Sequence, residues 1–401
     1  MQNPAVALRG QARNDEGTTH SAFHFIIFMF IAVLSACASP ATVALSPTLD
    51  PTPTAWPRTR LNSPEYAAQV FVWWKPETAR RDLNLLRDMG FTWVKQAFAW
   101  RDIEGNAKGH FSWELADEVV RKVGNRKLKL LARIDRQPFW SRPNDPAPLE
   151  NAPPENLQDF ADFCYTLAER YRGRIHAYQV WNEPNLAREW GGQPPEPAAY
   201  VELLKVCYTA IKRADPEALV VSAGMAPTGT WSNEVMPDDV FIERMYAAGA
   251  APYFDLLGVH APGFKAPPEA SPDEVAASPE LGGQRFFCFR HVEDLRALMV
   301  QHGDADKQVA VLEMGWTTDS IHPEYAWHRV DEQTQAAYLV RAFRFAQAHW
   351  SPWISLVTVI GFADPFWTED DEQYWWTIAY PDWPETRVKP AYAALQAMAK
   401  E

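Results

Sequence analysis

The chain has 401 residues, of which 47% are hydrophobic and 22% are charged. This composition predicts a folded body with a sizeable core and excludes a chain that is disordered along its whole length. The formal net charge is -13, and no cluster of Lys and Arg is interleaved with aromatic residues, so we expect no nucleic-acid partner. The numbers are typical of a globular enzyme or binding protein.

The beginning of the chain is typical of an export signal. Residues 23–37 are almost wholly apolar but too short to span a membrane comfortably, and Arg9 and Arg13 precede them. We therefore predict a signal peptide over residues 1–36. Its end, Leu34-Ser-Ala-Cys37, resembles the bacterial lipobox, and this resemblance implies that Cys37 is lipidated. A signal peptide with an incidental cysteine is the alternative.

A proline-rich segment follows the signal. Residues 37–65 hold six prolines with scattered Thr and Ser, a composition that stays extended and does not pack. We predict a tether that links a lipid anchor to a folded body at residues 66–401. The protein is then exported and membrane-anchored, facing the cell exterior or the periplasm, with no other membrane contact. The oligomeric state is left open.

From residue 66 onward, short apolar runs alternate with amphipathic stretches, which indicates parallel strands joined by crossover helices. The predicted strands lie at residues 69–73, 92–98, 127–134, 175–181, 219–223, 254–260, 308–313 and 354–361. The predicted helices include residues 77–89, 157–171, 197–213, 290–302, 332–349 and 390–400.

Eight such units predict one α/β domain, a (β/α)8 TIM barrel. A doubly wound open sheet is the alternative, but it usually carries a Gly-rich turn after its first strand, and Trp73-Trp-Lys-Pro76 is not such a turn. The largest insertions, residues 261–283 and 363–385, follow the C-terminal ends of strands six and eight. Barrel enzymes carry their active sites at these ends.

Two glutamates end predicted strands on facing sides of the ring. Glu183 ends strand four in the run from His176, and Glu313 ends strand seven in the run from Val309. Inward-pointing strand ends would aim the two carboxylates at one another across the barrel mouth. Paired carboxylates are the groups that hydrolyse glycosides.

The residues around both glutamates resemble the clan-A glycoside hydrolases. Asn182-Glu183-Pro184 and Leu312-Glu-Met-Gly-Trp316 are similar to the motifs of these retaining (β/α)8 enzymes, and Trp100-Arg-Asp-Ile-Glu104 and Pro138-Phe-Trp140 are similar to segments of families 5 and 39. The resemblance implies that Glu183 is the acid/base and Glu313 the nucleophile of a double displacement on the O-glycosides of a poly- or oligosaccharide.

One feature departs from the clan. His260-Ala-Pro-Gly263 follows strand six with the expected His but without the Tyr that often accompanies it. The group that steadies the nucleophile is therefore absent or comes from elsewhere in the chain.

Five further residues are predicted to bind substrate. Asn182 is placed to donate a hydrogen bond to a sugar hydroxyl beside the reacting carbon, and His260 accompanies the glutamates. Three of the 18 tryptophans, Trp140, Trp316 and Trp367, offer flat apolar faces to sugar rings. The alternatives are a backbone-bonded amide for Asn182, a core histidine for His260, and core packing for the tryptophans.

The other polar residues favour structural roles. Glu104, Asp135 and Asp364 are further acids at strand ends, and pairing with Arg101, Arg133 or Arg136 is favoured over catalysis. No spacing indicates a metal site and no Gly-rich loop a phosphate site, so we predict no metal and no cofactor. If Cys37 is lipidated, Cys164, Cys207 and Cys288 remain, which allows at most one disulfide, with buried free thiols as the default.

Two other functions stay open at this point. The first is a non-catalytic carbohydrate-binding lipoprotein on a glycosidase-like barrel, favoured by the missing Tyr and disfavoured by the intact glutamate pair. The second is an enzyme of another class on the same fold, which would need a metal or phosphate site.

Overall fold

The computed structural model describes residue 56 and residues 59–400. The predicted signal peptide, the lipidation site Cys37 and most of the predicted tether lie outside this part of the chain. Pro53–Glu401 forms one compact unit. Within the described residues, none of the helices has the length and apolar character that crossing a membrane requires.

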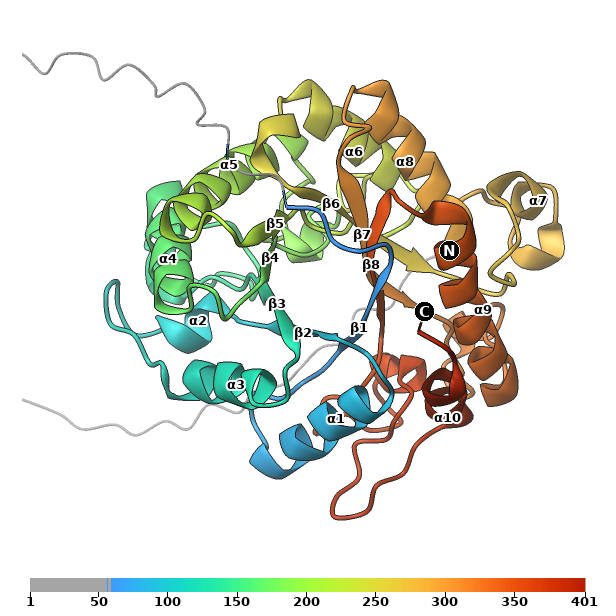
Figure 1. Cartoon of the computed structure of the whole chain (residues 1–401). Coiled ribbons are helices and arrows are strands. Elements are labelled where there is room, and N and C mark those ends of the chain that lie inside the picture. Colours follow the sequence, from blue (N-terminus) through green and yellow to red (C-terminus); the bar gives the residue numbers. More distant parts are fainter. Residues whose placement is uncertain (1–55, 57–58, 401) are drawn as a thin grey trace, which may run out of the picture. The chain divides into compact units, whose positions relative to one another are not determined.

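Eight parallel strands close into a barrel in chain order, with β8 paired to β1. The ring of strands lies inside a layer of helices (Figure 1), which confirms the predicted (β/α)8 fold. The strands are β1 (Glu65–Gln69), β2 (Trp93–Ala97), β3 (Lys129–Ile134), β4 (Ala177–Val180), β5 (Leu219–Val221), β6 (Leu256–Pro262), β7 (Gln308–Gly315) and β8 (Ile354–Val359).

The outer helices bury one apolar face each against the strands. In α3, for example, Ala116, Val119, Val120 and Val123 are buried at a spacing of three and four. The main helices are α1 (Pro76–Asp88), α3 (Glu114–Gly124), α4 (Leu157–Arg170), α5 (Pro197–Ala214), α6 (Asp238–Ala247), α8 (Val292–Gln301), α9 (Glu332–Trp350) and α10 (Pro390–Ala397). The short helices α2 (Trp100–Ile103) and α7 (Pro272–Ala276) lie in the loops after β2 and β6.

The position predicted for the first strand, residues 69–73, is wrong. The strand is Glu65–Gln69, and its register is fixed by Ala67, which lies opposite Trp93 of β2 and Thr358 of β8. The apolar run that suggested the strand continues past the end of β1 into the loop at the barrel mouth, where the Val70 N–H donates to the Lys95 carbonyl at 3.0 Å and the Val72 N–H donates to Oε1 of Gln96 at 2.8 Å.

The folded body begins before residue 66. The backbone N–H of Leu61 donates to Oε1 of Gln308 at 3.0 Å, and Nε2 of Gln308 donates to the Leu61 carbonyl at 3.1 Å. The last residues of the segment predicted as a tether therefore pack against the start of β7.

An apolar layer fills the inside of the ring. Alternate strand residues point to the same face. Trp93 of β2 and Leu131 of β3 belong to this layer, so Lys95 and Arg133, two residues nearer the C-terminal ends of the strands, also point inward. Polar side chains thus lie above an apolar floor, at the mouth. The floor consists of Ala67, Trp93, Leu131, Ala177, Leu219, Val221, Leu256, Ala310, Leu312 and Leu356.

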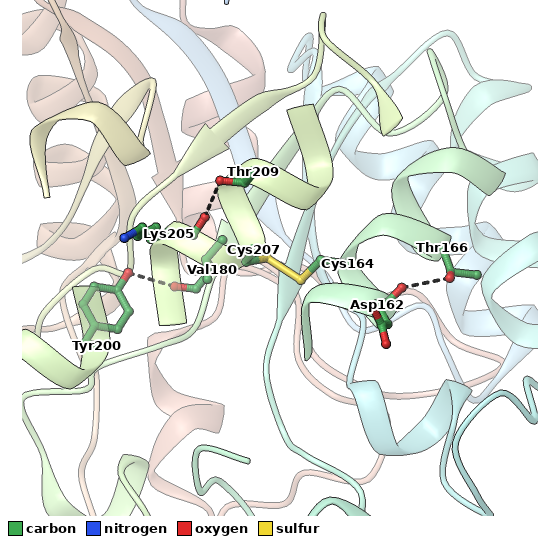
Figure 2. The surroundings of a disulfide bond; sticks show 8 residues. All are labelled: Asp162, Cys164, Thr166, Val180, Tyr200, Lys205, Cys207 and Thr209. Atoms are coloured by element: carbon green, nitrogen blue, oxygen red, sulfur yellow. Dashed lines mark hydrogen bonds between the residues drawn. A yellow bond between two sulfur atoms is a disulfide. The ribbon is translucent and has the colours of Figure 1, made fainter. Parts of the chain in front are cut away.

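A disulfide joins α4 to α5. Cys164 and Cys207 are bonded, with their Cα atoms 5.6 Å apart (Figure 2). The prediction of at most one disulfide is confirmed. The default expectation of buried free thiols is wrong for Cys164 and Cys207 but correct for Cys288. The two cysteines meet because adjacent helices of the outer layer pack side by side, a long-range contact that sequence spacing does not reveal.

Candidate active site

The chain leaves β4 through a strained turn that carries Glu183. Trp181 and Glu183 have φ angles of 72° and 43°, in the left-handed region that residues other than glycine rarely adopt. The turn is held by the Glu183 N–H, which donates to the Gly224 carbonyl at 3.0 Å, and by the buried Trp181, whose Nε1 donates to the Glu189 carbonyl at 2.7 Å. Strain that the surroundings enforce in this way is frequent at functional sites.

Helix α5 supports the same turn from outside the barrel. The hydroxyl of Tyr200 donates to the Val180 carbonyl at 3.0 Å (Figure 2) and accepts from the Ala223 N–H at 2.6 Å. One buried side chain therefore fixes the ends of β4 and β5 relative to each other.

A bulge in β7 turns Glu313 into the barrel. Ala310 and Leu312 belong to the inner apolar layer, so simple alternation would point Glu313 outward. The pairing of β7 with β8 shifts between Val311 and Met314, and Glu313 comes to lie beside His260 of β6. Bulges re-aim side chains in this way next to active sites.

Glu183, His260 and Glu313 meet at the mouth. Nδ1 of His260 lies 2.9 Å from Oε1 of Glu183 and 3.9 Å from Oε2 of Glu313. One oxygen of each glutamate and one ring nitrogen of His260 all lie within 4.8 Å of one another. The His260 ring packs on Gly224, where any Cβ would come 2.2 Å from the ring, so this position requires glycine.

Lys95 of β2 is the site residue that the sequence analysis missed. Its Nζ donates to Oε1 of Glu313 at 2.7 Å and to the Leu312 carbonyl at 3.1 Å. The Lys95 side chain is 2% exposed and that of Glu313 is 20% exposed. Among the described residues, the close hydrogen bond to the Glu313 carboxylate thus comes from Lys95 of β2 and not from a Tyr. A lysine within the otherwise uncharged run 92–98 is the signal that could have revealed it.

Positive charge surrounds Glu313. Burial raises the pKa of Glu313, but the charges of Lys95, His260 and Arg133 outweigh burial and lower this pKa to about 2. Burial also lowers the pKa of Lys95, and the Glu313 carboxylate counteracts part of that effect. Glu313 is therefore ionised at neutral pH and compensated mainly by Lys95.

The three central residues are close enough to hold a cation, but their surroundings disfavour one. Lys95 already neutralises Glu313, and Nη1 of Arg133 lies 4.0 Å from the same carboxylate oxygen. A metal ion would face two buried positive charges at short range, so we assign no metal to this cluster.

Asn182 and Trp140 lie near the mouth and are largely covered. Asn182 is 8% exposed, and its Oδ1 accepts from Nε2 of Gln179 at 3.3 Å. Trp140 is half-buried and donates from Nε1 to the Glu104 carbonyl at 2.6 Å. The substrate-binding role of both residues stays a prediction.

The other two predicted tryptophans differ in depth. Trp367 is half-buried and packs edge-on against Phe71, with ring centroids 4.6 Å apart. Trp316 is 0% exposed, and its Nε1 donates to the Ala266 carbonyl at 2.9 Å under the loop after β6. Trp316 therefore has no face open to a sugar here, and the packing alternative fits it better.

The remaining strand-end acids have structural partners. Asp135 forms the predicted ion pair with Arg133, at 2.9 Å. Glu104 accepts a hydrogen bond from Nε1 of Trp100 at 2.7 Å instead of pairing with an arginine, because α2 places this indole one helical turn before it. Asp364 accepts from the backbone N–H two residues onward at 2.9 Å, within its own loop.

The chain is similar to known glycoside hydrolases. The family model described as cellulase (glycosyl hydrolase family 5) matches residues 50–248, slightly under half of the chain, which include Glu183 but end before Glu313. No curated protein matches the chain.

Solved structures share the fold at low sequence identity. A family 39 glycoside hydrolase from Bacteroides cellulosilyticus WH2 has a TM-score of 0.60 and 20% identity, with 84% of this chain and 64% of that chain covered. A monomeric β-xylosidase from Caulobacter crescentus CB15 has a TM-score of 0.58 and 17% identity, with 84% of this chain and 69% of that chain covered. A family 10 endoxylanase from a sugarcane soil metagenome has a TM-score of 0.56 and 16% identity, with 84% of this chain and 97% of that chain covered.

The solved structures agree with the closed barrel, and the family-model match supports glycosidase activity. The chain spans less than two thirds of the length of the Bacteroides protein, and at these identities the structural matches establish the fold alone.

Proposed function

We propose that the protein is a retaining glycoside hydrolase that cleaves O-glycosidic bonds of an oligo- or polysaccharide by double displacement. One observation carries this proposal. An oxygen of Glu183 and an oxygen of Glu313 lie within 4.8 Å across the mouth. Retaining enzymes keep their carboxyl groups ~5 Å apart, whereas inverting enzymes need a wider gap for a water molecule between carboxylate and sugar.

The electrostatics suit two different roles for the two acids. Glu313 is ionised and faces Lys95, so it can attack the anomeric carbon as nucleophile. Glu183 gives a proton to the departing glycosidic oxygen, and a covalent glycosyl ester on Glu313 results. Glu183 then takes a proton from the incoming water, and hydrolysis of the ester releases the sugar with its original anomeric configuration.

Two further groups support the acid/base residue. His260 contacts Glu183 through Nδ1 and keeps its carboxyl turned toward Glu313. Asn182 lies next to Glu183 in the chain and is proposed to bind the sugar hydroxyl beside the reacting carbon, a contact that strengthens in the transition state.

The likenesses also favour a first set of substrates. A cellulase family model, a β-xylosidase and an endoxylanase are among the matches. Glucans and xylans, and their oligosaccharides, are therefore the substrates to test first.

We also propose that the enzyme works outside the cytoplasm as a lipoprotein. The proposal rests on the predicted signal, the lipobox-like Leu34-Ser-Ala-Cys37 and the proline-rich segment after it. The Cys164–Cys207 disulfide supports it, because such bonds persist in oxidising compartments. Replacing Cys37 with Ser should release the protein from membranes, and a variant that still sediments with membranes in detergent-free buffer would refute the anchor.

A screen of nitrophenyl glycosides followed by azide rescue tests the catalytic proposal. Glu183→Ala should still react with a good leaving group but stall at the ester, because no base activates water. Added azide needs no base and should restore turnover, giving a glycosyl azide with the configuration of the substrate. An inverted azide would refute the retaining mechanism. Binding of oligosaccharides without turnover by the wild type would favour the non-catalytic alternative.

A further inference from the structure

Lys95 depends on Glu313 for its charge compensation. Among the described residues, Glu313 is the one carboxylate in contact with its ammonium group, and the other hydrogen-bond partner is the neutral Leu312 carbonyl. Arg133, the second cation near Glu313, differs in this respect. It lies 4.0 Å from Glu313 and 2.9 Å from its own partner Asp135. Loss of the Glu313 charge would therefore leave Lys95 without a carboxylate in contact and Arg133 still paired.

We propose that Lys95 is a positioning residue that favours the free Glu313 carboxylate over its glycosyl ester and so drives hydrolysis of the covalent intermediate. This inference rests on the proposed function and adds to it a distinct role in each half-reaction.

The contacts of Glu313 indicate which oxygen attacks. Oε1 accepts the hydrogen bond from Lys95, whereas Oε2 has only Nδ1 of His260 nearby, at 3.9 Å, within the described part of the chain. In the first half-reaction a bond forms between Oε2 and the anomeric carbon, and the bond from that carbon to the leaving oxygen breaks. The proton of Glu183 goes to the leaving oxygen.

The first half-reaction removes the counter-ion of Lys95. In the ester, Oε1 is a neutral carbonyl oxygen that still accepts a hydrogen bond but no longer carries charge. The Lys95 side chain is 2% exposed, so water does not replace the lost charge interaction. A buried charge without its partner is costly, and this cost raises the free energy of the covalent intermediate.

The second half-reaction returns the counter-ion. Water attacks the anomeric carbon, Glu183 takes its proton, and the electron pair of the breaking ester bond returns to Glu313. Negative charge grows on Glu313 beside a fixed ammonium, an arrangement that lowers the barrier of the charge-forming step. The other charged or titratable groups that face Lys95 and Glu313 are Arg133 of β3, Glu183 at the end of β4, and His260 of β6.

Replacing Lys95 with Met should slow the two half-reactions unequally. The ratio kcat/KM reports events up to glycosylation, while kcat reports deglycosylation once the ester accumulates. We expect Lys95→Met to lower kcat about tenfold or more, with KM falling in parallel and kcat/KM changing less than about threefold. A burst of nitrophenol should precede the steady state. At steady state, intact-mass measurement should detect the covalent glycosyl-enzyme.

A matched control exists in the outer layer. Lys212 is also buried and forms an ion pair of the same length, 2.7 Å, with Asp255. Lys212→Met should reduce stability without a burst and without changing kcat or KM. Lys95→Arg restores a positive charge and should restore part of the deglycosylation rate.

A second measurement uses the wild type itself and does not depend on the folding of a variant. An activated 2-deoxy-2-fluoro glycoside of the preferred sugar traps the ester, and its reactivation is followed as pH rises. Reactivation should slow at high pH, as Lys95 without its Glu313 counter-ion loses its proton. Lys95→Met, where it folds, should lack this decline.

The outcomes separate this inference from the proposed function. A wild type that cleaves no glycoside contradicts the proposed function itself. An active wild type whose Lys95→Met variant loses kcat and kcat/KM by the same factor, without ester accumulation, contradicts the inference alone. The inference is also contradicted if reactivation of the trapped wild-type enzyme shows no decline at high pH.

Discussion

Two buried lysine–carboxylate pairs in this barrel are alike in length and differ in what surrounds them. Lys95–Glu313 at the mouth and Lys212–Asp255 in the outer layer both measure 2.7 Å. The outer pair is closed by the backbone: Lys212 also donates to the Ala218 carbonyl at 2.7 Å, and Asp255 accepts from the Val220 N–H at 2.8 Å. In the mouth pair Lys95 likewise donates to the Leu312 carbonyl at 3.1 Å, but no backbone N–H of the described residues donates to the Glu313 carboxylate.

The difference shows that burial of an ion pair does not by itself mark a functional site. The mouth has unused polar capacity. Buried Oε1 of Gln179 and Nε2 of His260 also have no hydrogen-bond partner within residues 59–400. Each unsatisfied buried polar atom costs free energy, and the free atoms at the mouth suit the binding of a polar ligand, whereas others, such as Oδ2 of Asp82, lie elsewhere in the barrel.

The largest expected contrast between the two pairs is in catalysis. Replacing Glu313 with Gly removes the nucleophile, so no covalent intermediate forms, and turnover of every glycoside should fall on the order of 10^5-fold. Asp255→Asn should leave the activity per folded molecule unchanged. Initial rates on a nitrophenyl glycoside measure both variants, and wild-type rates in Glu313→Gly would place the nucleophile elsewhere.

Removing the disulfide tests whether the outer layer serves stability alone. Cys164 and Cys207 are 43 residues apart in sequence, and loop-closure entropy predicts a loss of about 4 kcal/mol when the bond is absent. Urea unfolding of the Cys164→Ser, Cys207→Ser double variant should show this loss. If kcat of the folded double variant also fell, by a factor that corresponds to a similar free energy, α4 and α5 would also position the active site.

Breaking the outer ion pair should have a slightly smaller effect. Asp255→Asn leaves Lys212 buried without its counter-ion, which predicts a loss of about 3 kcal/mol in the free energy of unfolding. The double variant with Lys212→Met should recover part of it, because no unpaired charge then remains. Equal stability of the single variant and the wild type would show that this pair is not the structural counterpart that we describe.

The last contrast concerns pH and a third buried group of the outer layer. Burial alone would lower the pKa of His291, but Asp238 and Asp294 outweigh burial and raise it to about 10. Because the folded-state pKa lies above the unfolded value, this stabilisation is complete below pH ~6.5 and disappears as pH rises through about 10.

The slope from this one group is at most about 1.4 kcal/mol per pH unit. His291→Asn should flatten the alkaline decline of the thermal midpoint, and a variant with the same decline as the wild type would contradict the assignment.

The sequence was sufficient for most of the fold because strand and helix periodicities are local. Each strand after the first lies within or overlaps its predicted range, from β2 at Trp93–Ala97 to β8 at Ile354–Val359. The first strand was misplaced because Glu65 begins it with a charge and because the apolar residues just after Gln69 imitate a strand.

The site was only partly visible in the sequence. Glu183 and Glu313 stand at strand ends, where polar residues after an apolar run are conspicuous. The contact of Lys95 with Glu313 depends on the inward face of β2 and on the bulge in β7, and both are set by long-range pairing. The burial of Trp316 depends in the same way on how the loop after β6 folds over it.

The identity of the attacking carboxylate tests the central claim most directly. The wild-type protein is incubated with an activated 2-deoxy-2-fluoro glycoside of its preferred sugar, digested, and its peptides are mapped by mass spectrometry. We predict one fluoroglycosyl group, esterified to Glu313, and its absence when Glu313 is replaced with Gly. Inactivation with the label on another residue, or turnover of the fluoroglycoside through an inverted product without any covalent adduct, would contradict the account.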